Sequence, residues 1–121
     1  MNRMRILIVG RELNQYDYFA TAIAKRACDA VAVSSAADGL ALIDHVDACL
    51  LEITSSSVDA VSAIRTLRAK SDLPLVVIAS VVSSDACAEA LLAGADDYLS
   101  RAVNIDELIA RIRALRRRHR P

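Results

Sequence analysis

The side chains best suited to acid–base, nucleophilic or metal chemistry are few in this 121-residue chain, and they lie far apart along it. The two histidines, His45 and His119, fall in a presumed helix and in an arginine-rich tail, with no nucleophile at a spacing typical of a hydrolase. The three cysteines sit in apolar stretches without C-x-x-C spacing: Cys28, Cys49 and Cys87. We therefore expect buried, reduced thiols, and neither a catalytic triad nor a zinc site.

Glycine-rich loops that bind phosphate are also missing. Neither G-x-x-x-x-G-K-[ST] nor G-x-G-x-x-G occurs, and the chain has only three glycines. A nucleotide-dependent enzyme is therefore not expected. The polar groups that remain of interest follow apolar runs: Glu52 with the hydroxyl run Thr54–Ser57 (TSSS), and Arg101.

These groups must be positioned by short apolar runs that alternate with segments of helical spacing. The runs are typical of buried parallel strands: Arg5–Val9, Ala30–Val33, Ala48–Ile53 and Leu75–Ala79. A fifth short strand is expected at Asp97–Ser100, after Gly94. Five strands alternating with five helices predict a doubly wound α/β sheet with right-handed crossovers. Such sheets bind ligands beyond the carboxyl ends of their strands, so function is expected in the loops after these runs.

The last helix has the clearest boundaries. Asn104 is placed to cap it, Glu107 stands where a capping box has its acidic residue, and Val103 with Leu108 fits a hydrophobic staple. Gly94 is placed to end the preceding helix in a left-handed conformation. Together these signals predict a terminal amphipathic helix that follows the fifth strand directly.

Composition favours one folded domain over residues 1–121. The chain is 55% apolar and 25% charged, with 15 basic and 15 acidic residues, which argues against disorder. No apolar run approaches the ~20 residues of a membrane span, and no secretory signal is visible. We expect a cytoplasmic domain, and an end at Pro121 is compatible with the N-terminal part of a longer protein.

The zero net charge conceals an uneven distribution. Six arginines fall within the last eleven residues, so residues 1–110 hold 9 basic against 15 acidic groups. One interpretation is an exposed helix end, where cations suit the helix dipole, and another is a partner-binding or interdomain segment. Direct nucleic-acid binding by this domain through its arginine-rich tail is not expected, because the rest of the domain is acidic.

Four segments carry a resemblance to a known family: RILIVGRE, CLLEITSSSVDAVSAIRTLR, LPLVVIAS and AGADDYLSRAVNIDELIARIRALRRR. Together they resemble the receiver (CheY-like) domain of bacterial two-component response regulators, and the last is similar to the OmpR/PhoB subfamily. The resemblance implies a flavodoxin-like (βα)5 fold with sheet order 2-1-3-4-5. It also implies signal transduction, with no enzymatic activity of the domain's own.

The positions that carry chemistry in this family are all replaced here. In typical receivers an acidic pair follows strand 1, an aspartate ends strand 3, Thr or Ser ends strand 4, and Lys-Pro ends strand 5. The matching positions hold Gly10 and Arg11, Glu52, Ala79, and Arg101 with Ala102. The family's pocket carries a charge of about −2, whereas Glu52 against Arg11 and Arg101 gives about +1, which would repel a cation. We therefore expect no Mg²⁺, no other cofactor and no phosphorylation of Glu52.

Two interpretations of Glu52 stay open. It forms an ion pair with Arg101 or Arg11 that holds the emptied pocket together, or it acts as a permanent mimic of a phosphoryl group. Ala79 favours the ion pair, because the resemblance implies that a hydroxyl at this position couples the charge on the third strand to Tyr98, the family's switch residue. Ala79 has no hydroxyl, so this coupling is lost.

The OmpR/PhoB resemblance also implies a two-fold dimer through the fourth helix, fifth strand and last helix. Asp97 with Arg111 fills one of the usual complementary pairs, and Asp85 with Arg118 could fill another. The matching partners of Glu107 and Arg113 are replaced by Cys87 and Leu92, and Asp96 completes the expected face. The alternative is that these charges are only solvated surface groups, since exposed pairs contribute about 0 to 1 kcal/mol.

The sequence thus predicts a degenerate, phosphorylation-independent receiver that dimerises and serves a DNA-binding domain beyond Pro121. One alternative is a stand-alone signalling adaptor. Another is a sensor of small anions that uses Arg11, Arg101 and the hydroxyls of Thr54, Ser55, Ser56 and Ser80. A flavin enzyme of flavodoxin-like topology would share the sheet but lacks a phosphate-binding loop.

Overall fold

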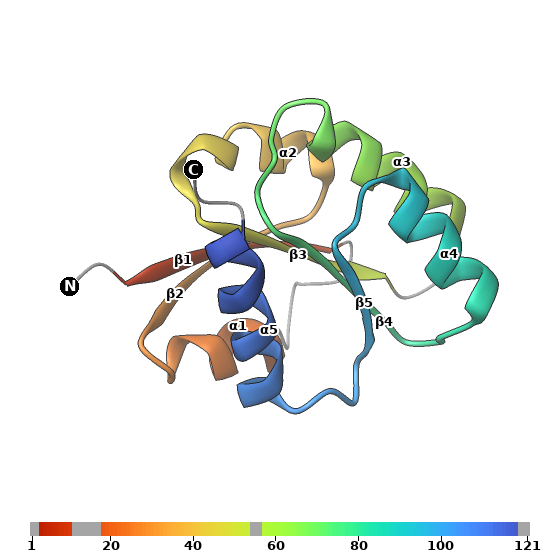
Figure 1. Ribbon diagram of the computed structural model, residues 1–121. Coiled ribbons are helices and arrows are strands. Elements are labelled where there is room, and N and C mark those ends of the chain that lie inside the picture. Colours follow the sequence, from red (N-terminus) through yellow and green to blue (C-terminus); the bar gives the residue numbers. More distant parts are fainter. Residues whose placement is uncertain (1–2, 11–17, 54–56, 119–121) are drawn as a thin grey trace.

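A single parallel sheet organises the computed structural model, which describes residues 3–10, 18–53 and 57–118 (Figure 1). Its strands are β1 (Met4–Val9), β2 (Cys28–Val33), β3 (Ala48–Ile53), β4 (Leu75–Ala79) and β5 (Asp97–Ser100). They are hydrogen-bonded in the order β2-β1-β3-β4-β5, all parallel. The predicted flavodoxin-like fold is confirmed. β2 begins two residues earlier than its apolar run because Cys28 pairs with Met4 at the start of β1.

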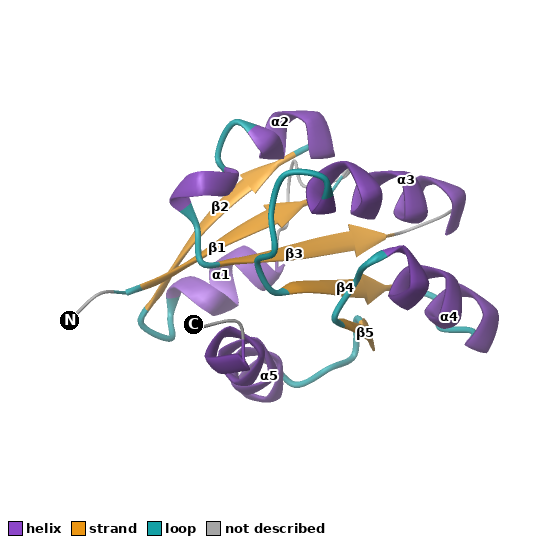
Figure 2. Ribbon diagram, turned by 45° about the horizontal axis from the view of Figure 1, so that its top comes forward, coloured by secondary structure: helices purple, strands orange, loops and turns teal. Residues whose placement is uncertain are grey.

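Helices cover both faces of the sheet (Figure 2). They are α1 (Tyr18–Ala24), α2 (Ala36–Leu40), the 3₁₀ helix η1 (Ile43–His45), α3 (Ser57–Arg68), α4 (Ser84–Ala93) and α5 (Ile105–Arg118). Helices α1 and α5 lie on one face, and α2, α3 and α4 lie on the other. His45 was expected within a second helix, but it ends a 3₁₀ turn that follows the short α2.

Two apolar clusters, one on each face, make up the core. Along β1, Ile6 and Ile8 join the cluster under α1 and α5, while Leu7 and Val9 join the cluster under α2 and α3. This alternation follows from the two-residue period of a strand. Both faces of the central strands are therefore buried, as parallel sheets require.

Helix ends follow the predicted signals in part. Asn104 Oδ1 accepts hydrogen bonds from the backbone N–H of Asp106 at 2.8 Å and of Glu107 at 3.3 Å, which confirms the cap of α5. The Glu107 carboxylate instead accepts from Arg111 Nε at 2.9 Å, one helical turn along. Gly94 ends α4 at a φ of 127°, in the region that favours glycine.

Arg68, the last residue of α3, links the end of this helix to the residues that precede β4 and β5. Its guanidinium donates to the carbonyl oxygens of Gly94 (2.6 Å) and Leu73, and to the Asp96 carboxylate. Asp96 Oδ2 also accepts from the backbone N–H of Leu75 at 2.8 Å. Both side chains are about four-fifths buried, with 18% and 22% exposed. This network therefore joins three segments that are distant in sequence.

The three cysteines are free thiols, of which Cys28 and Cys49 are buried and Cys87 is half-buried. Burial raises the pKa of the Cys49 thiol to about 12, with Arg68 acting in the opposite direction. A thiol with such a pKa is protonated at neutral pH, so Cys49 is a poor nucleophile. Its place in the core is structural.

Candidate functional site

The carboxyl ends of the strands bring together four of the positions that differ from a typical receiver. Backbone hydrogen bonds extend the sheet beyond its strands, because Gly10 N–H donates to the Val33 carbonyl at 3.0 Å and Arg101 N–H donates to the Ala79 carbonyl at 3.1 Å. Glu52 lies one residue before the end of β3, which pairs with β4. Gly10, Glu52, Ala79 and Arg101 therefore line one edge of the sheet.

An ion pair spans this edge. Arg101 Nη1 lies 3.6 Å from Glu52 Oε1, and the glutamate side chain is only 8% exposed, against 37% for the arginine. The Arg101 guanidinium carbon also lies 5.5 Å from the centroid of the Phe19 ring of α1, which is buried. A guanidinium over an aromatic face is attracted by the ring quadrupole. Arg101 is thus held by a carboxylate and a ring from two other elements.

The donor set does not fit Mg²⁺. This ion requires several oxygen ligands in near-octahedral geometry. Gly10 has no side chain, Ala79 offers a methyl group, and the Glu52 carboxylate faces a guanidinium. Within residues 3–10, 18–53 and 57–118, no group of three or more His, Cys, Asp or Glu side chains could hold a metal ion. Arg11 and the hydroxyls of Thr54–Ser56 lie outside the described residues.

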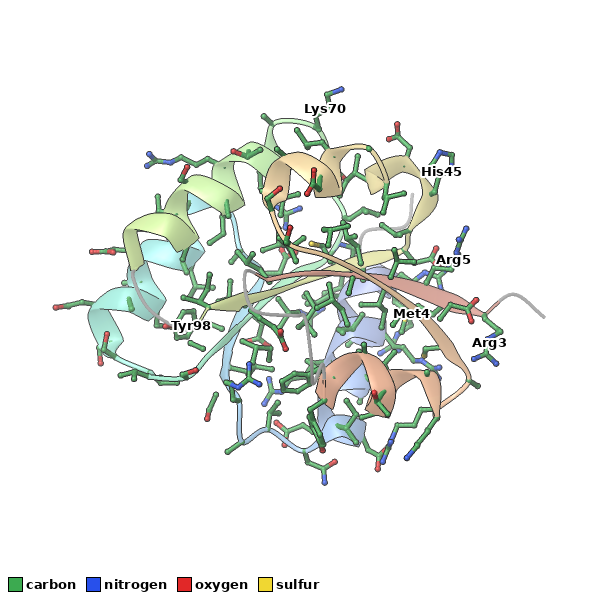
Figure 3. All side chains as sticks on the ribbon, turned by 180° about the vertical axis from the view of Figure 1, so that it is seen from behind. Arg3, Met4, Arg5, His45, Lys70 and Tyr98 are labelled. Atoms are coloured by element: carbon green, nitrogen blue, oxygen red, sulfur yellow. The ribbon has the colours of Figure 1, made fainter. Side chains whose placement is uncertain are left out.

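Tyr98 connects β5 with the loop between β4 and α4. Its hydroxyl donates to the carbonyl oxygen of Val81 at 3.4 Å, and its ring is half-buried against the cluster under α3 and α4 (Figure 3). Burial raises the pKa of the Tyr98 phenol, and the neighbouring Cys87 raises it further. The phenol is therefore a neutral hydrogen-bond donor at physiological pH.

The expected dimer charges meet within one chain. Arg111 Nη1 lies 3.3 Å from Asp97 Oδ2, and its Nε lies 2.9 Å from Glu107 Oε2. The hydrogen bond that Arg111 donates to Glu107 and the charges of the Asp97 and Glu107 carboxylates raise the pKa of Arg111. Asp85 and Arg118 are exposed on α4 and at the end of α5. The face formed by α4, β5 and α5, here called the α4–β5–α5 face, thus holds an internally paired charge cluster.

Three residues that the sequence placed on this face are positioned differently. Asp96 is bound by Arg68, and Arg113 Nη2 lies 3.7 Å from Cys28 Sγ at the start of β2. Leu92 lines a hollow of about 660 Å³ between α3 and α4, together with Arg65 and other residues. A helix turns by about 100° per residue, so neighbours on α4 and α5 face different elements.

Sequence reasoning expected Leu92 and Cys87 to make this region more apolar, but it missed the other exposed apolar side chains. Val81, Val82, Leu91 and Leu92 are four of the five large apolar side chains exposed in the described residues. The Val81–Val82 pair, which follows β4 after Ser80, was a usable signal, because loops seldom need two adjacent branched apolar residues. Cys87 and Leu91 are four residues apart and share a side of α4 that faces β5, since Cys87 neighbours Tyr98.

A search for membrane-crossing segments gives a negative result. Within the described ranges, none of the helices has the length and the apolar character that crossing a membrane requires.

Comparisons with known proteins agree with this geometry. The family model "Response regulator receiver domain" matches residues 6–113. The response regulator MprA of Mycobacterium leprae is 40% identical over 79 residues, which are 64% of this chain and 35% of that protein. MprA of Mycobacterium tuberculosis H37Rv is 37% identical over 95 residues, 74% of this chain and 41% of that protein. The chain thus spans less than half the length of these curated relatives.

Solved structures show the same fold. A two-component response regulator from Clostridium difficile superposes with a TM-score of 0.83 at 21% identity, covering 98% of this chain and 100% of that one. An orphan response regulator of Helicobacter pylori, HP1043, gives a TM-score of 0.72 at 25% identity, covering 93% of this chain and 98% of that one. The family match covers most of the described sheet and helices. This chain therefore belongs to the response regulator receiver domains of two-component signalling.

Proposed function

We propose that this receiver domain signals without accepting a phosphoryl group and that its output is contact with other proteins. The observation that carries the proposal is the Glu52–Arg101 ion pair, held over Phe19 at the edge where receivers accept phosphate. A phosphoryl acceptor must present a free carboxylate oxygen to the incoming group. Glu52 instead presents its carboxylate to a guanidinium within a nearly closed site.

The charge balance of the site supports the same conclusion. Phosphoryl transfer is stabilised mainly by cations that neutralise the transferring oxygens, with Mg²⁺ as the usual ion. The described residues do not fit that ion, and Arg101 is already engaged by Glu52. The ion-pair interpretation of Glu52 is also favoured over the phosphoryl mimic. Ala79 has no hydroxyl that could move toward a charge at Glu52, and the Tyr98 hydroxyl donates a hydrogen bond to the Val81 carbonyl oxygen.

The first prediction is that the chain stays unmodified when incubated with acetyl phosphate and Mg²⁺. Intact-mass spectrometry is expected to show no gain of a phosphoryl group, because the described residues of the site do not fit Mg²⁺ and the Glu52 carboxylate faces the Arg101 guanidinium. As a positive control, the variant that combines Gly10→Asp, Arg11→Asp, Glu52→Asp, Ala79→Thr and Arg101→Lys restores the family's charges. It is expected to gain one phosphoryl group in a Mg²⁺-dependent reaction.

A Mg²⁺-dependent mass gain of the unaltered chain, absent from Glu52→Gln, would contradict the proposal. A gain that persists in Glu52→Gln would instead reflect modification elsewhere, and peptide mapping would locate it. Folding of the five-fold variant is checked by circular dichroism before its result is used.

We further propose that the domain forms a two-fold dimer in the cytoplasm through the α4–β5–α5 face and serves a DNA-binding domain beyond residue 121. The OmpR/PhoB resemblance and the exposed Val82 and Leu91 support this proposal. An isologous interface buries the same patch of both subunits, and apolar side chains tolerate this better than repeated charges. The stand-alone adaptor alternative would use the same face.

The second prediction uses two adjacent leucines of α4. Leu91→Asp is expected to weaken self-association at least tenfold, because it places a charge on the side of α4 that faces β5. Leu92→Asp is the matched control: Leu92 is more exposed, 88% against 44%, but lines the hollow beside α3. Sedimentation equilibrium measures both dissociation constants. A wild-type chain that is monomeric at the highest soluble concentration, or equal effects of both variants, would disprove this interface.

The anion-sensing alternative has less support in the structure. Its main cation, Arg101, lies 3.6 Å from Glu52 and over the Phe19 ring, so a small anion would have to compete with the Glu52 carboxylate for this guanidinium.

A further inference from the structure

Arginines from both ends of the chain converge at the amino-terminal edge of the sheet, opposite the Glu52 site. Arg3 donates from Nη2 to the Cys28 carbonyl at 2.9 Å and pairs with Asp29 at 2.8 Å. Arg113 of α5 approaches the same residue, with Nη2 at 3.7 Å from Cys28 Sγ. The start of β2 therefore joins the amino terminus to α5.

A second contact extends this edge to β1 and β3. Arg116 Nη2 lies 3.1 Å from Asp47 Oδ1, and the other oxygen of Asp47 accepts from the backbone N–H of Arg5 at 2.8 Å. Arg117 is exposed in the same last turn of α5. Figure 3 shows Arg3 and Arg5 near the start of β1, with Met4 between them in sequence. We call Arg3, Arg5, Arg113, Arg116 and Arg117 the basic edge.

The basic edge carries cations that no carboxylate neutralises. Asp29 forms an ion pair with Arg3, and Asp47 forms one with Arg116. Within the described part of the chain, Arg5, Arg113 and Arg117 make no ion pair. Asp44 of η1, three residues before Asp47, is exposed and is counted against these arginines as well. A net positive charge of about two therefore remains at the edge, where a guanidinium can bind a phosphate with two parallel hydrogen bonds.

The surroundings favour a polyanion over a protein partner. The centre of a protein–protein interface is enriched in apolar and aromatic side chains. None of the large apolar side chains exposed in the described residues lies at this edge: they belong to α1, to the β4–α4 loop and to α4. Protein–nucleic acid interfaces are more polar and much more positively charged.

We propose that the basic edge binds the phosphate backbone of duplex nucleic acid, without reading its sequence. The sequence predicts no such binding by this domain, because the rest of the chain is acidic. The fold changes that balance locally by adding Arg3 and Arg5 to the tail and by pairing the two nearest aspartates. The proposal goes beyond the proposed function and does not depend on phosphorylation or on the α4–β5–α5 face.

The test titrates the 121-residue chain into a fluorescently labelled duplex of mixed sequence and follows anisotropy at increasing salt. If three arginines contact phosphates, the affinity should fall about 40-fold between 50 and 200 mM salt, since each contact contributes about 0.9 to the logarithmic slope. Arg113→Gln/Arg117→Gln should weaken binding at least tenfold at the lower salt and reduce the slope by about 2.

The matched control is Arg65→Gln/Lys70→Gln, which removes the same charge from exposed positions of α3 and the residues after it, on the other face of the sheet. It should leave both the affinity and the slope unchanged. Binding that is absent at the lower salt, or that falls equally in both double variants, overturns the proposal. A parallel titration with inorganic polyphosphate separates the sources of phosphate: binding of polyphosphate without binding of the duplex also overturns it.

Discussion

Replacing Arg68 with alanine is expected to lower the free energy of unfolding by about 3 kcal/mol, among the largest single effects in this domain. The substitution removes charge-assisted hydrogen bonds to Gly94, Leu73 and Asp96. It also removes the Arg68 guanidinium from its ion pair with the Asp96 carboxylate, which is 22% exposed. This expected loss of unfolding free energy is smaller than that for breaking a fully buried ion pair, because water still reaches both side chains.

Urea denaturation followed by circular dichroism measures this effect. Arg65→Ala is the matched control, because Arg65 is an exposed arginine on the same helix, one turn earlier. It should change stability by less than about 0.5 kcal/mol, as surface substitutions usually do. Equal losses in the two variants would show that the Arg68 network contributes nothing beyond helix propensity.

Gly94→Ala is expected to destabilise the fold by about 2 to 3 kcal/mol for two separate reasons. The backbone φ of 127° is one that residues with a Cβ rarely adopt. An added Cβ would also lie 2.7 Å from Arg68 Cγ, a distance that forces the arginine to move. Gly39→Ala is the comparison, since its Cβ would approach Leu7 and Val9 side-chain atoms at 3.3 Å with no conformational penalty of this kind.

The double variant Arg68→Ala/Gly94→Ala separates the two reasons. Removing the Arg68 side chain removes the clash, so the combined loss should be smaller than the sum of the single losses by about 1 kcal/mol. Thermal and urea unfolding of the four proteins give this coupling energy. Strict additivity would mean that only the backbone conformation of Gly94 matters and that the steric contact is relieved at no cost.

The order of strands and helices could be predicted from the sequence because it depends on short-range patterns. Continuous apolar runs identify parallel strands, and the cap at Asn104 is a local arrangement of a side chain and two N–H groups. The meeting of Gly10, Glu52, Ala79 and Arg101 also followed, because the topology of a parallel sheet places strand ends at one edge. The pairing of Glu52 with Arg101 was one of the expected alternatives.

The direction of side chains on helices could not be predicted in the same way. Whether Arg113 faces β5 or β2 depends on how α5 is rotated against the sheet, which the buried Ile109 and Ile112 determine through contacts with several strands. Asp96 was expected on the dimer face, or as a solvated surface charge. Its actual partner, Arg68, is 28 residues away in sequence, and no local pattern marks such a contact. The stacking of Phe19 under Arg101 was missed for the same reason.

The internal pairing of Arg111 with Asp97 and Glu107 has a consequence for assembly. A second subunit could offer these groups only partners of the kind they already have, so swapping them between chains gains little electrostatic free energy. Association through this side of the molecule should then be nearly indifferent to ionic strength. Its thermodynamic signature should be a negative change in heat capacity, which reports apolar surface removed from water.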